Sequence, residues 1–212
     1  MHKRNEMLKI ILLLTLLKGA LMAIEEPKYT VIEKYDTFEI REYAPYLVAQ
    51  TEVSGKFEEM GNKAFRILVK YISGENQQRS KIKMTAPVIQ EPKGDNGIKI
   101  QMTAPVIQEL DQTNPQSAVF SFVMPEKFTL ETLPLPLDKR ITLQEIPART
   151  VAVREYSGSW GEEKYKENET ILLQALHDAD IKVIGKPIFA RYNSPFALWF
   201  MRRNEIMVEI ER

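Results

Sequence analysis

The chain has 212 residues, of which 44% are hydrophobic and 27% are charged, with 29 basic and 29 acidic side chains and no cysteine. This balance is typical of a globular protein and excludes disordered, collagen-like and coiled-coil chains. The lack of cysteine excludes disulfides, thiolate catalysis and cysteine-ligated metal centres. The matched charges argue against binding to nucleic acid.

Residues 1–23 have the three-part pattern of a secretory signal peptide. Lys3 and Arg4 precede an apolar run at residues 10–17, and the segment ends at the small residue Ala23. The run is shorter than the roughly 20 apolar residues that a membrane-spanning helix needs. We therefore expect cleavage after Ala23 and a periplasmic or secreted protein without a stable membrane span. An uncleaved membrane anchor is the alternative.

Apolar and polar residues alternate from Tyr29 to Val53, which predicts strands separated near Asp36 and at Pro45. From residue 57 to residue 72 the spacing becomes helical, with one apolar stripe. The stripe contains Met60, Ala64, Leu68 and Tyr71. We expect Ser54 and Gly55 to cap the start of this helix and Gly74 to cap its end.

A short direct repeat follows the helix. Residues 81–91 and 99–109 share the sequence Lys-Ile-x-Met-Thr-Ala-Pro-Val-Ile-Gln-Glu and are identical at ten of eleven positions. Turn-forming residues separate the copies, so we expect two strands joined through a loop. The proline in each copy indicates a bulge, a strand end or a sheet edge, which favours an architectural role for the repeat.

A longer internal symmetry relates the two halves of the chain. Val48-Ala49, Ser54-Gly55 and Phe57 reappear 103 residues later as Val151-Ala152, Ser157-Gly158 and Trp160. An amphipathic helix follows in each half, and the second is expected over residues 162–179, with Leu172 and Leu176 on its apolar stripe. Each half therefore has the order strand, strand, helix, strand, strand.

The last two strands of each half follow from apolar runs. They are expected over Ala118–Met124 in the first half, after the repeat, and over Ala197–Met201 and Glu205–Ile210 in the second. The chain is thus predicted to form one α+β domain over residues 24–212, with pseudo-repeats at about 29–124 and 141–212.

Several segments, in this order, resemble the SOUL haem-binding protein family. They are Glu39-Ile40-Arg41-Glu42-Tyr43, Tyr71-Ile72-Ser73-Gly74-Glu75-Asn76, the Met-Thr-Ala-Pro-Val repeats, Phe122-Val123-Met124-Pro125, Ala190–Phe196 and Trp199–Glu205. The resemblance covers about residues 26–211. It implies a distorted antiparallel β-barrel flanked by two helices, and binding of haem or another tetrapyrrole without catalysis. Bacterial effector-binding domains share this fold, so the fold alone does not fix the ligand.

Haem presents a large apolar face and two carboxylates, so a site for it needs an apolar groove edged by cations. The first helix offers both on neighbouring faces. Its basic stripe contains Lys63, Arg66 and Lys70, beside the apolar residues Met60, Ala64, Ile67 and Tyr71. The resemblance adds a loop of the second half with Ser194, Pro195 and Phe196. The same basic stripe is also typical of the solvated face of any amphipathic helix.

No metal ligand is expected. Some members of the family are thought to ligate iron through a histidine of the first half, where this chain has none. His177, the only histidine after residue 23, lies near Asp178 and Asp180 at the end of the second helix. We therefore expect apolar and carboxylate contacts to hold a porphyrin more than a bond to iron.

The sequence leaves two other classes of function to consider, an enzyme and a different binding module. Catalysis is disfavoured, because Ser157–Gly161 lacks the order of a nucleophile elbow and one histidine in the second helix does not make a catalytic triad. The remaining alternative is an envelope binding module for another hydrophobic small molecule or for a protein partner.

Overall fold

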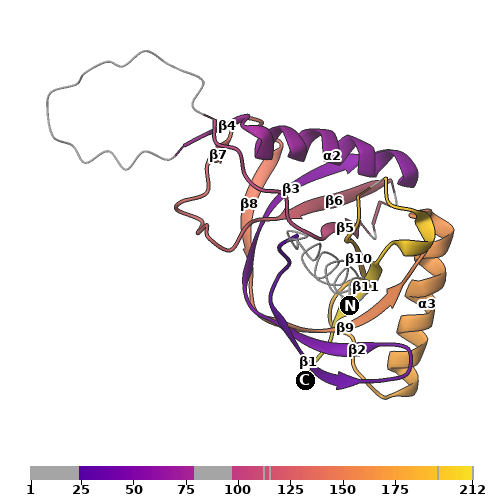
Figure 1. Cartoon of the computed structure of the whole chain (residues 1–212). Coiled ribbons are helices and arrows are strands. Elements are labelled where there is room, and N and C mark those ends of the chain that lie inside the picture. The colour runs from indigo at the N-terminus through magenta and orange to yellow at the C-terminus, as the bar shows by residue number, and fades with distance from the viewer. Residues whose placement is uncertain (1–23, 79–96, 112, 115, 195, 212) are drawn as a thin grey trace, which may run out of the picture.

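The computed structural model describes residues 24–78, 97–111, 113–114, 116–194 and 196–211. The expected signal segment at 1–23, the first repeat copy at 81–91 and Pro195 lie outside these residues. Within them, a long curled antiparallel sheet carries two helices (Figure 1). In the described chain neither helix is long and apolar enough to cross a membrane.

The main sheet has nine strands in the order β1-β2-β9-β11-β10-β5-β6-β3-β8. Their bounds are Tyr29–Lys34 (β1), Glu39–Tyr43 (β2), Tyr46–Ser54 (β3), Val106–Leu110 (β5), Ser117–Val123 (β6), Ile141–Ile146 (β8), Arg149–Tyr156 (β9), Ile188–Arg191 (β10) and Asn204–Glu209 (β11). A separate pair joins β4 (Asn76–Gln77) to β7 (Leu135–Pro136).

The strand order is symmetric about the central pair β10 and β5. Strands β2, β9, β11 and β10 on one side correspond to β8, β3, β6 and β5 on the other. The first strand of each half pairs with the second strand of the other half, as β2 does with β9 and β3 does with β8. The predicted fold class is confirmed: two helices and an antiparallel barrel-like sheet, built from two related halves. The sheet is a half-barrel whose edges, within the described chain, are β1 and β8.

The two helices are α2 (Phe57–Ser73) and α3 (Glu162–Asp178), close to the predicted ranges. Gly74 ends α2 with a φ of 122°, as expected for a glycine cap. The expected cap at the start is wrong, because the N-cap residue is Lys56 and makes no side-chain cap bond. Gly55 instead makes the sharp turn from β3 into α2 with a φ of 147°, and Gly158 does the same in the second half with a φ of 134°.

The strand predicted at Ala197–Met201 is wrong. These residues form a loop with a short 3₁₀ helix, η1 (Trp199–Met201), and the strand of this half is β10. Uninterrupted apolar residues are typical of a buried strand, so the sequence of this run predicts a strand where the chain forms a loop. The side chains of Leu198, Trp199, Phe200 and Met201 are in fact exposed.

Each face of the sheet has its own core. Both helices pack on one face, where α2 contributes Met60, Leu68 and Tyr71 and α3 contributes Leu172 and Leu176. The other face is covered by a smaller cluster around Tyr43, Ala190, Tyr192 and Met207. Because successive residues of a strand point to opposite faces, Arg191 at the end of β10 faces the helices and Tyr192 faces the second cluster.

Candidate ligand-binding groove

A groove of about 630 Å³ lies where the two helices begin. Its lining includes Phe57 and Gly61 of α2, Trp160 just before α3, and Val106 and Arg191, which face each other on the central strands β5 and β10. The groove therefore spans the boundary between the two related halves. Its volume lies within the range of about 300–1,000 Å³ that is common for small-molecule sites.

The walls of the groove are mainly apolar and are fixed by contacts outside it. The apolar lining consists of Ile24, Phe57, Phe65, Met102, Ala104, Val106, Trp160 and Phe196. The Trp160 indole nitrogen donates a hydrogen bond of 2.8 Å to Asn204 Oδ1, and the Phe65 ring lies 5.7 Å from that of Phe122. A flat apolar ligand would thus meet walls that are already in place.

Arg191 places a positive charge among three aromatic rings, of which Trp160 lines the groove and Phe120 and Phe189 belong to the core beside it. Its guanidinium carbon lies 4.5 Å from the ring centre of Phe189, 5.6 Å from Trp160 and 5.9 Å from Phe120. Its Nη2 donates a hydrogen bond to the buried amide oxygen of Gln108. Such packing holds a guanidinium in one orientation.

The charge of Arg191 has no carboxylate partner in the described part of the chain. Burial lowers the pKa of Arg191 to about 10, so the group stays charged at neutral pH although it is poorly solvated. Two donors, Arg191 Nε and Gln108 Nε2, find no acceptor among the described residues. A buried cation without a counterion is costly, and an anionic ligand would remove that cost.

Gly61 gives the Arg191 guanidinium the room that it occupies. A Cβ atom at position 61 would lie 2.8 Å from Arg191 Nη1, which is closer than such atoms approach. Glycine inside a helix costs about 1 kcal/mol relative to alanine. The close approach of α2 to Arg191 accounts for a glycine at this position.

The structure separates the residues of α2 that were expected to share one site. Met60, Ala64, Ile67 and Tyr71 are buried in the core, and the Tyr71 hydroxyl donates a hydrogen bond of 2.8 Å to the carbonyl oxygen of Pro134. These side chains pack under the helix, and none of them lines the groove.

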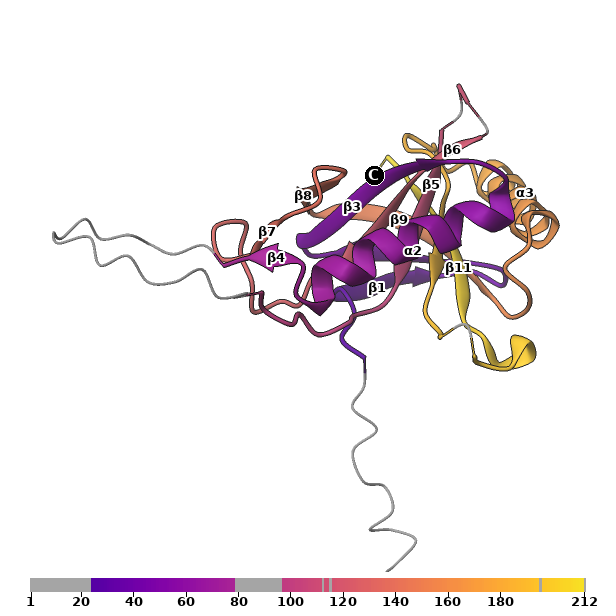
Figure 2. The same cartoon turned by 90° about the horizontal axis from the view of Figure 1, so that it is seen from above.

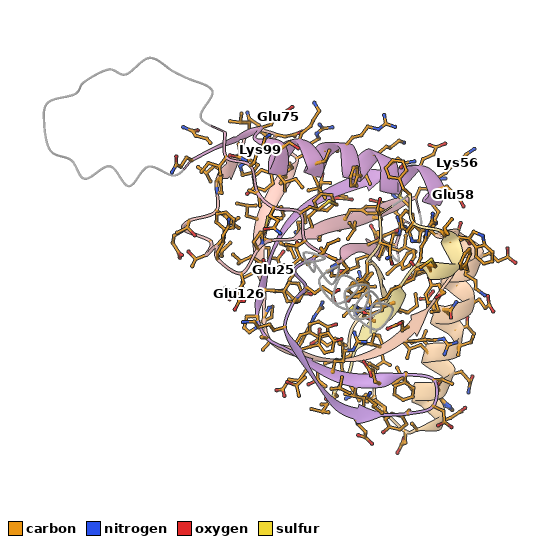
Figure 3. The ribbon with its side chains drawn as sticks, viewed as in Figure 1. Glu25, Lys56, Glu58, Glu75, Lys99 and Glu126 are labelled. Atoms are coloured by element: carbon orange, nitrogen blue, oxygen red, sulfur yellow. The ribbon has the colours of Figure 1, made fainter. Side chains whose placement is uncertain are left out.

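Lys63, Arg66 and Lys70 lie on another side of α2. Together with Arg140 and the predicted apolar residue Ile67 they line a separate hollow of about 450 Å³ against the end of β3. Lys63 and Lys70 are exposed and lie 3.7 and 3.6 Å from Glu59 and Glu75. Figure 3 shows Glu75 at the end of α2, remote from Lys56 and Glu58, which mark the end beside the groove. Of the expected loop residues, Ser194 and Phe196 do line the groove.

Four further residues line the groove that the sequence did not predict as site residues: Phe57, Gly61, Trp160 and Arg191. Two signals pointed to some of them: Phe57 and Trp160 occupy equivalent positions of the internal symmetry, and Gly61 interrupts a good helical sequence. The second copy of the repeat also lines the groove through Met102–Ala104 and Val106. It has an architectural role as well, since the Thr103 hydroxyl donates a hydrogen bond to the carbonyl oxygen of Val123.

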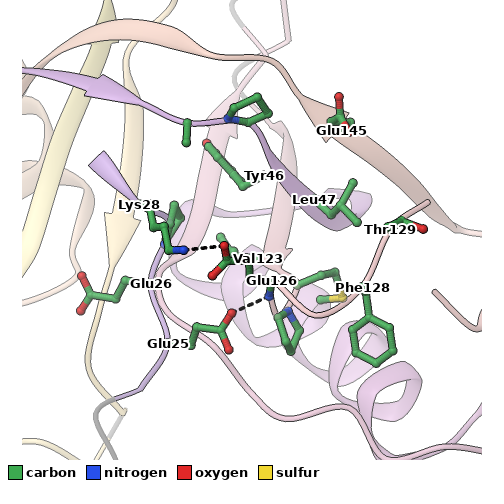
Figure 4. Close-up of a pocket in the computed structure, with 15 residues that line it drawn as sticks. Glu25, Glu26, Lys28, Tyr46, Leu47, Val123, Glu126, Phe128, Thr129 and Glu145 are labelled. Atoms are coloured by element: carbon green, nitrogen blue, oxygen red, sulfur yellow. Dashed lines mark hydrogen bonds and ion pairs between the residues drawn. The ribbon is translucent and has the colours of Figure 1, made fainter. Parts of the chain in front are cut away.

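A second pocket, shown in Figure 4, lies between the first described residues and the end of β6. Its volume is about 200 Å³, below the usual range for small-molecule sites. Acidic groups dominate its polar lining, which includes Glu25, Glu26, Glu126 and Glu145. Its one lysine, Lys28, lies 2.5 Å from Glu126. The lysine charge is therefore already paired and is not open to an anionic ligand.

His177 is remote from the groove. Its side chain is exposed at the end of α3 and lies 3.5 Å from Asp178 Oδ1. At 1.5 Å per residue, the helix separates it from Gly161 by roughly 24 Å. Among the described residues no group of three or more His, Asp or Glu side chains is placed to hold a metal ion.

The described chain is therefore a curled antiparallel sheet with two helices on one face and an apolar groove where the helices begin. The model of the SOUL heme-binding protein family matches residues 24–209, and the chain belongs to this family. It is similar to heme-binding protein 2 of Homo sapiens, with 28% identity over 91% of this chain and 93% of the relative. The mouse (Mus musculus) protein of that name is 27% identical over 88% of this chain and 90% of its own length.

Solved structures share the fold at low identity. The crystal structure of the EcmrR C-terminal domain has a TM-score of 0.55 and 12% identity, covering 87% of this chain and 98% of that domain. An EcmrR–DNA complex gives a TM-score of 0.57 and 14% identity, covering 100% of this chain and 67% of the other. These similarities show the fold alone.

Proposed function

We propose that the protein binds haem or a related tetrapyrrole in the groove between the starts of α2 and α3, without catalysing a reaction. The observation that carries this proposal is Arg191, a positive charge in an aromatic setting with no carboxylate partner in the described chain. A porphyrin propionate would supply that partner. The names of the relatives support haem as the ligand class.

The residues of the groove fit such a ligand. The apolar walls suit the porphyrin face, Gly61 leaves room for the Arg191 guanidinium beside α2, and Asn62 and Asn193 add polar groups to the lining. Bound haem would supply a redox-active iron, whereas the chain supplies the apolar walls, the charge and the exclusion of water. A hydrogen bond to a charged group contributes about 1.5–3 kcal/mol, which corresponds to roughly tenfold to hundredfold in affinity.

The experiment is an absorption titration of the full chain with hemin and with metal-free protoporphyrin. Arg191→Met removes the charge of the groove, and Arg66→Met removes an exposed charge from the separate hollow on another side of α2 as a matched control. We expect one porphyrin per chain, a loss of about tenfold or more for Arg191→Met with both porphyrins, and less than about twofold for Arg66→Met.

Two results would contradict this assignment. If Arg66→Met weakens binding and Arg191→Met does not, the carboxylates lie over the hollow beside Lys63 and Arg66. If neither porphyrin binds more tightly than to an unrelated protein, haem is not the ligand, and the groove serves another hydrophobic small molecule or a protein partner.

We also propose that residues 1–23 direct export and that residues 24–212 form one domain in the periplasm or outside the cell. The support is the sequence pattern, with basic residues before an apolar run and Ala23 at its end. N-terminal sequencing of the protein from fractionated cells tests this. An intact Met1 on cytoplasmic material would contradict export.

A further inference from the structure

The loop between β10 and β11 presents an apolar tip to the surroundings. The tip consists of Phe196, Leu198, Trp199, Phe200 and Met201. Phe196 is 95% exposed and Trp199 63% exposed. Contiguous apolar side chains at this level of exposure are rare on soluble proteins and mark surfaces of interaction.

Part of the backbone of the tip is hydrogen-bonded within the loop. The amide of Ala197 donates to the carbonyl oxygen of Ser194 at 3.0 Å, and the amide of Met201 donates to that of Leu198 at 2.9 Å. Arg202 Nε donates to the carbonyl oxygen of Ala197 at 3.0 Å. Each of these bonds lowers the cost of moving a polar group of the loop out of water.

The base of the tip is anchored on the sheet. The amide of Arg203 donates a hydrogen bond of 2.6 Å to Asn193 Oδ1, and the Arg203 guanidinium lies 3.0 Å from a carboxylate oxygen of Glu26 and 2.8 Å from one of Glu205. The guanidinium of Arg202 lies over the Trp160 ring at 4.4 Å. The apolar tip therefore projects from a charged base that hydrogen bonds and ion pairs fix to the sheet.

We propose that this tip docks the protein on a lipid bilayer, with its aromatic side chains in the interfacial region. Tryptophan and phenylalanine beside arginine are the composition of interfacial anchors. A stable protein interface needs about 800 Å² on each partner, usually from 20–30 residues, whereas the tip has five exposed apolar residues on one projecting loop (Figure 2). A bilayer requires no complementary shape.

The start of the described chain lies on the same side. Ile24, which is 52% exposed, lines the groove together with Phe196, and Figure 2 shows the first described residues and the η1 loop projecting in one direction. The apolar run at residues 10–17 precedes Ile24 by only a few residues. If that run is retained as an anchor, the chain would leave the membrane just before Ile24.

Docking in this orientation would turn the mouth of the groove toward the lipid. Phe196, Ile24 and the exposed Met102 form the apolar part of that mouth. If the groove binds a porphyrin, as proposed above, an apolar ligand could pass between bilayer and groove without crossing water. The docking itself does not depend on the ligand, so it is tested with no porphyrin present.

The test uses the full chain and phosphatidylcholine vesicles whose acyl chains carry bromine, which quenches nearby tryptophan emission. The chain has two tryptophans, Trp160 and Trp199, so Trp199→Phe leaves only Trp160 as a matched control. A third protein, Phe200→Glu with Met201→Glu, keeps both tryptophans but places charges in the tip. Sedimentation velocity without vesicles reports self-association.

We expect strong quenching and a blue shift in the unaltered chain, and little of either in Trp199→Phe or in the doubly charged variant. If all three proteins bind vesicles but the Trp199 emission is not quenched, the residues before Ile24 bind alone and the proposal is wrong. If the unaltered chain forms dimers that the charged variant does not, and its emission is not quenched, the tip is a contact between two copies instead.

Discussion

Two arginines on opposite faces of the same sheet have opposite electrostatic surroundings. Arg41 of β2 is buried to 3% exposure, and its Nη1 lies 3.0 Å from both carboxylate oxygens of Glu205. Burial alone would lower the pKa of Arg41, but attraction by Glu205 and Tyr43 outweighs it and raises the pKa. Arg191 is poorly solvated as well, and its pKa is lowered because no carboxylate offsets the burial.

The difference separates a structural charge from a binding charge. Around Arg41, the Tyr192 hydroxyl donates a bond of 2.7 Å to Glu205, and Arg203 approaches the same carboxylate, so the network satisfies itself. Around Arg191 the described chain offers an amide oxygen and three aromatic rings. The missing counterion is the signature of a site completed by a ligand.

Glu205→Gln has the largest expected effect, on the free energy of unfolding. The substitution removes the buried carboxylate that Arg41 shares with Arg203 and leaves Arg41 only the partly exposed Glu39, 2.5 Å from its Nε. Breaking a buried charge cluster in this way typically costs about 3–5 kcal/mol. Urea unfolding of the full chain measures the loss. Glu155→Gln is the matched control: the exposed Glu155 lies 3.6 Å from Arg203, and its loss is expected to cost less than about 1 kcal/mol. If both substitutions lowered the free energy of unfolding equally, the structural role assigned to the buried pair of Arg41 and Glu205 would be wrong.

Arg191→Met is expected to leave the free energy of unfolding within about 1 kcal/mol of the parent. The variant loses cation–π contacts but also removes an uncompensated charge, and these contributions oppose each other. Arg41→Met, compared in the same urea titration, is expected to lose about 3–5 kcal/mol because the fully buried Glu205 keeps only Arg203 as a cationic partner. A loss of that size in Arg191→Met would mean that Arg191 is structural.

Gly61→Ala separates stability from binding within α2. Alanine stabilises a helix interior by about 1 kcal/mol relative to glycine, while its Cβ pushes the Arg191 guanidinium from its position. We expect unchanged or higher stability and a roughly fivefold weaker porphyrin affinity, corresponding to about 1 kcal/mol. Lys63→Ala, on the exposed side of α2, controls for the helix effect. Tighter binding by Gly61→Ala would contradict the assigned position of the ligand carboxylate.

The combined variant Lys63→Met, Arg66→Met, Lys70→Met has the smallest expected effect. These side chains are solvated on the side of α2 away from the groove, and exposed ion pairs contribute about 0–1 kcal/mol each. Porphyrin affinity, measured by absorption at physiological salt, is expected to change less than about twofold. A tenfold loss of porphyrin affinity would mean that the basic stripe of Lys63, Arg66 and Lys70 binds the ligand.

Much of the fold could be predicted because periodicity reports burial directly. The stripe of Met60, Ala64, Leu68 and Tyr71 is buried as expected, and the 103-residue symmetry anticipated the two halves of the sheet. The segment Ala197–Met201 shows where this reasoning fails. An apolar run indicates burial only where the side chains do not form an exposed surface for interaction.

The candidate site was harder to predict because it depends on desolvation, which spacing does not reveal. Lys63, Arg66 and Lys70 form an evident stripe, but their charges remain in water. Arg191 is a single basic residue at the end of β10, and the rings around it come from β6, from β10 itself and from the segment before α3. Only the folded chain brings Phe120, Phe189 and Trp160 to the same guanidinium.

The most direct test of a carboxylate held by Arg191 is a double comparison of hemin and hemin dimethyl ester. Both ligands are titrated against the unaltered chain and against Arg191→Met, which isolates the coupling between the guanidinium and the propionates. We predict that the unaltered chain prefers the free acid by about tenfold or more, and that Arg191→Met loses most of this preference. An equal preference in both proteins would contradict the account.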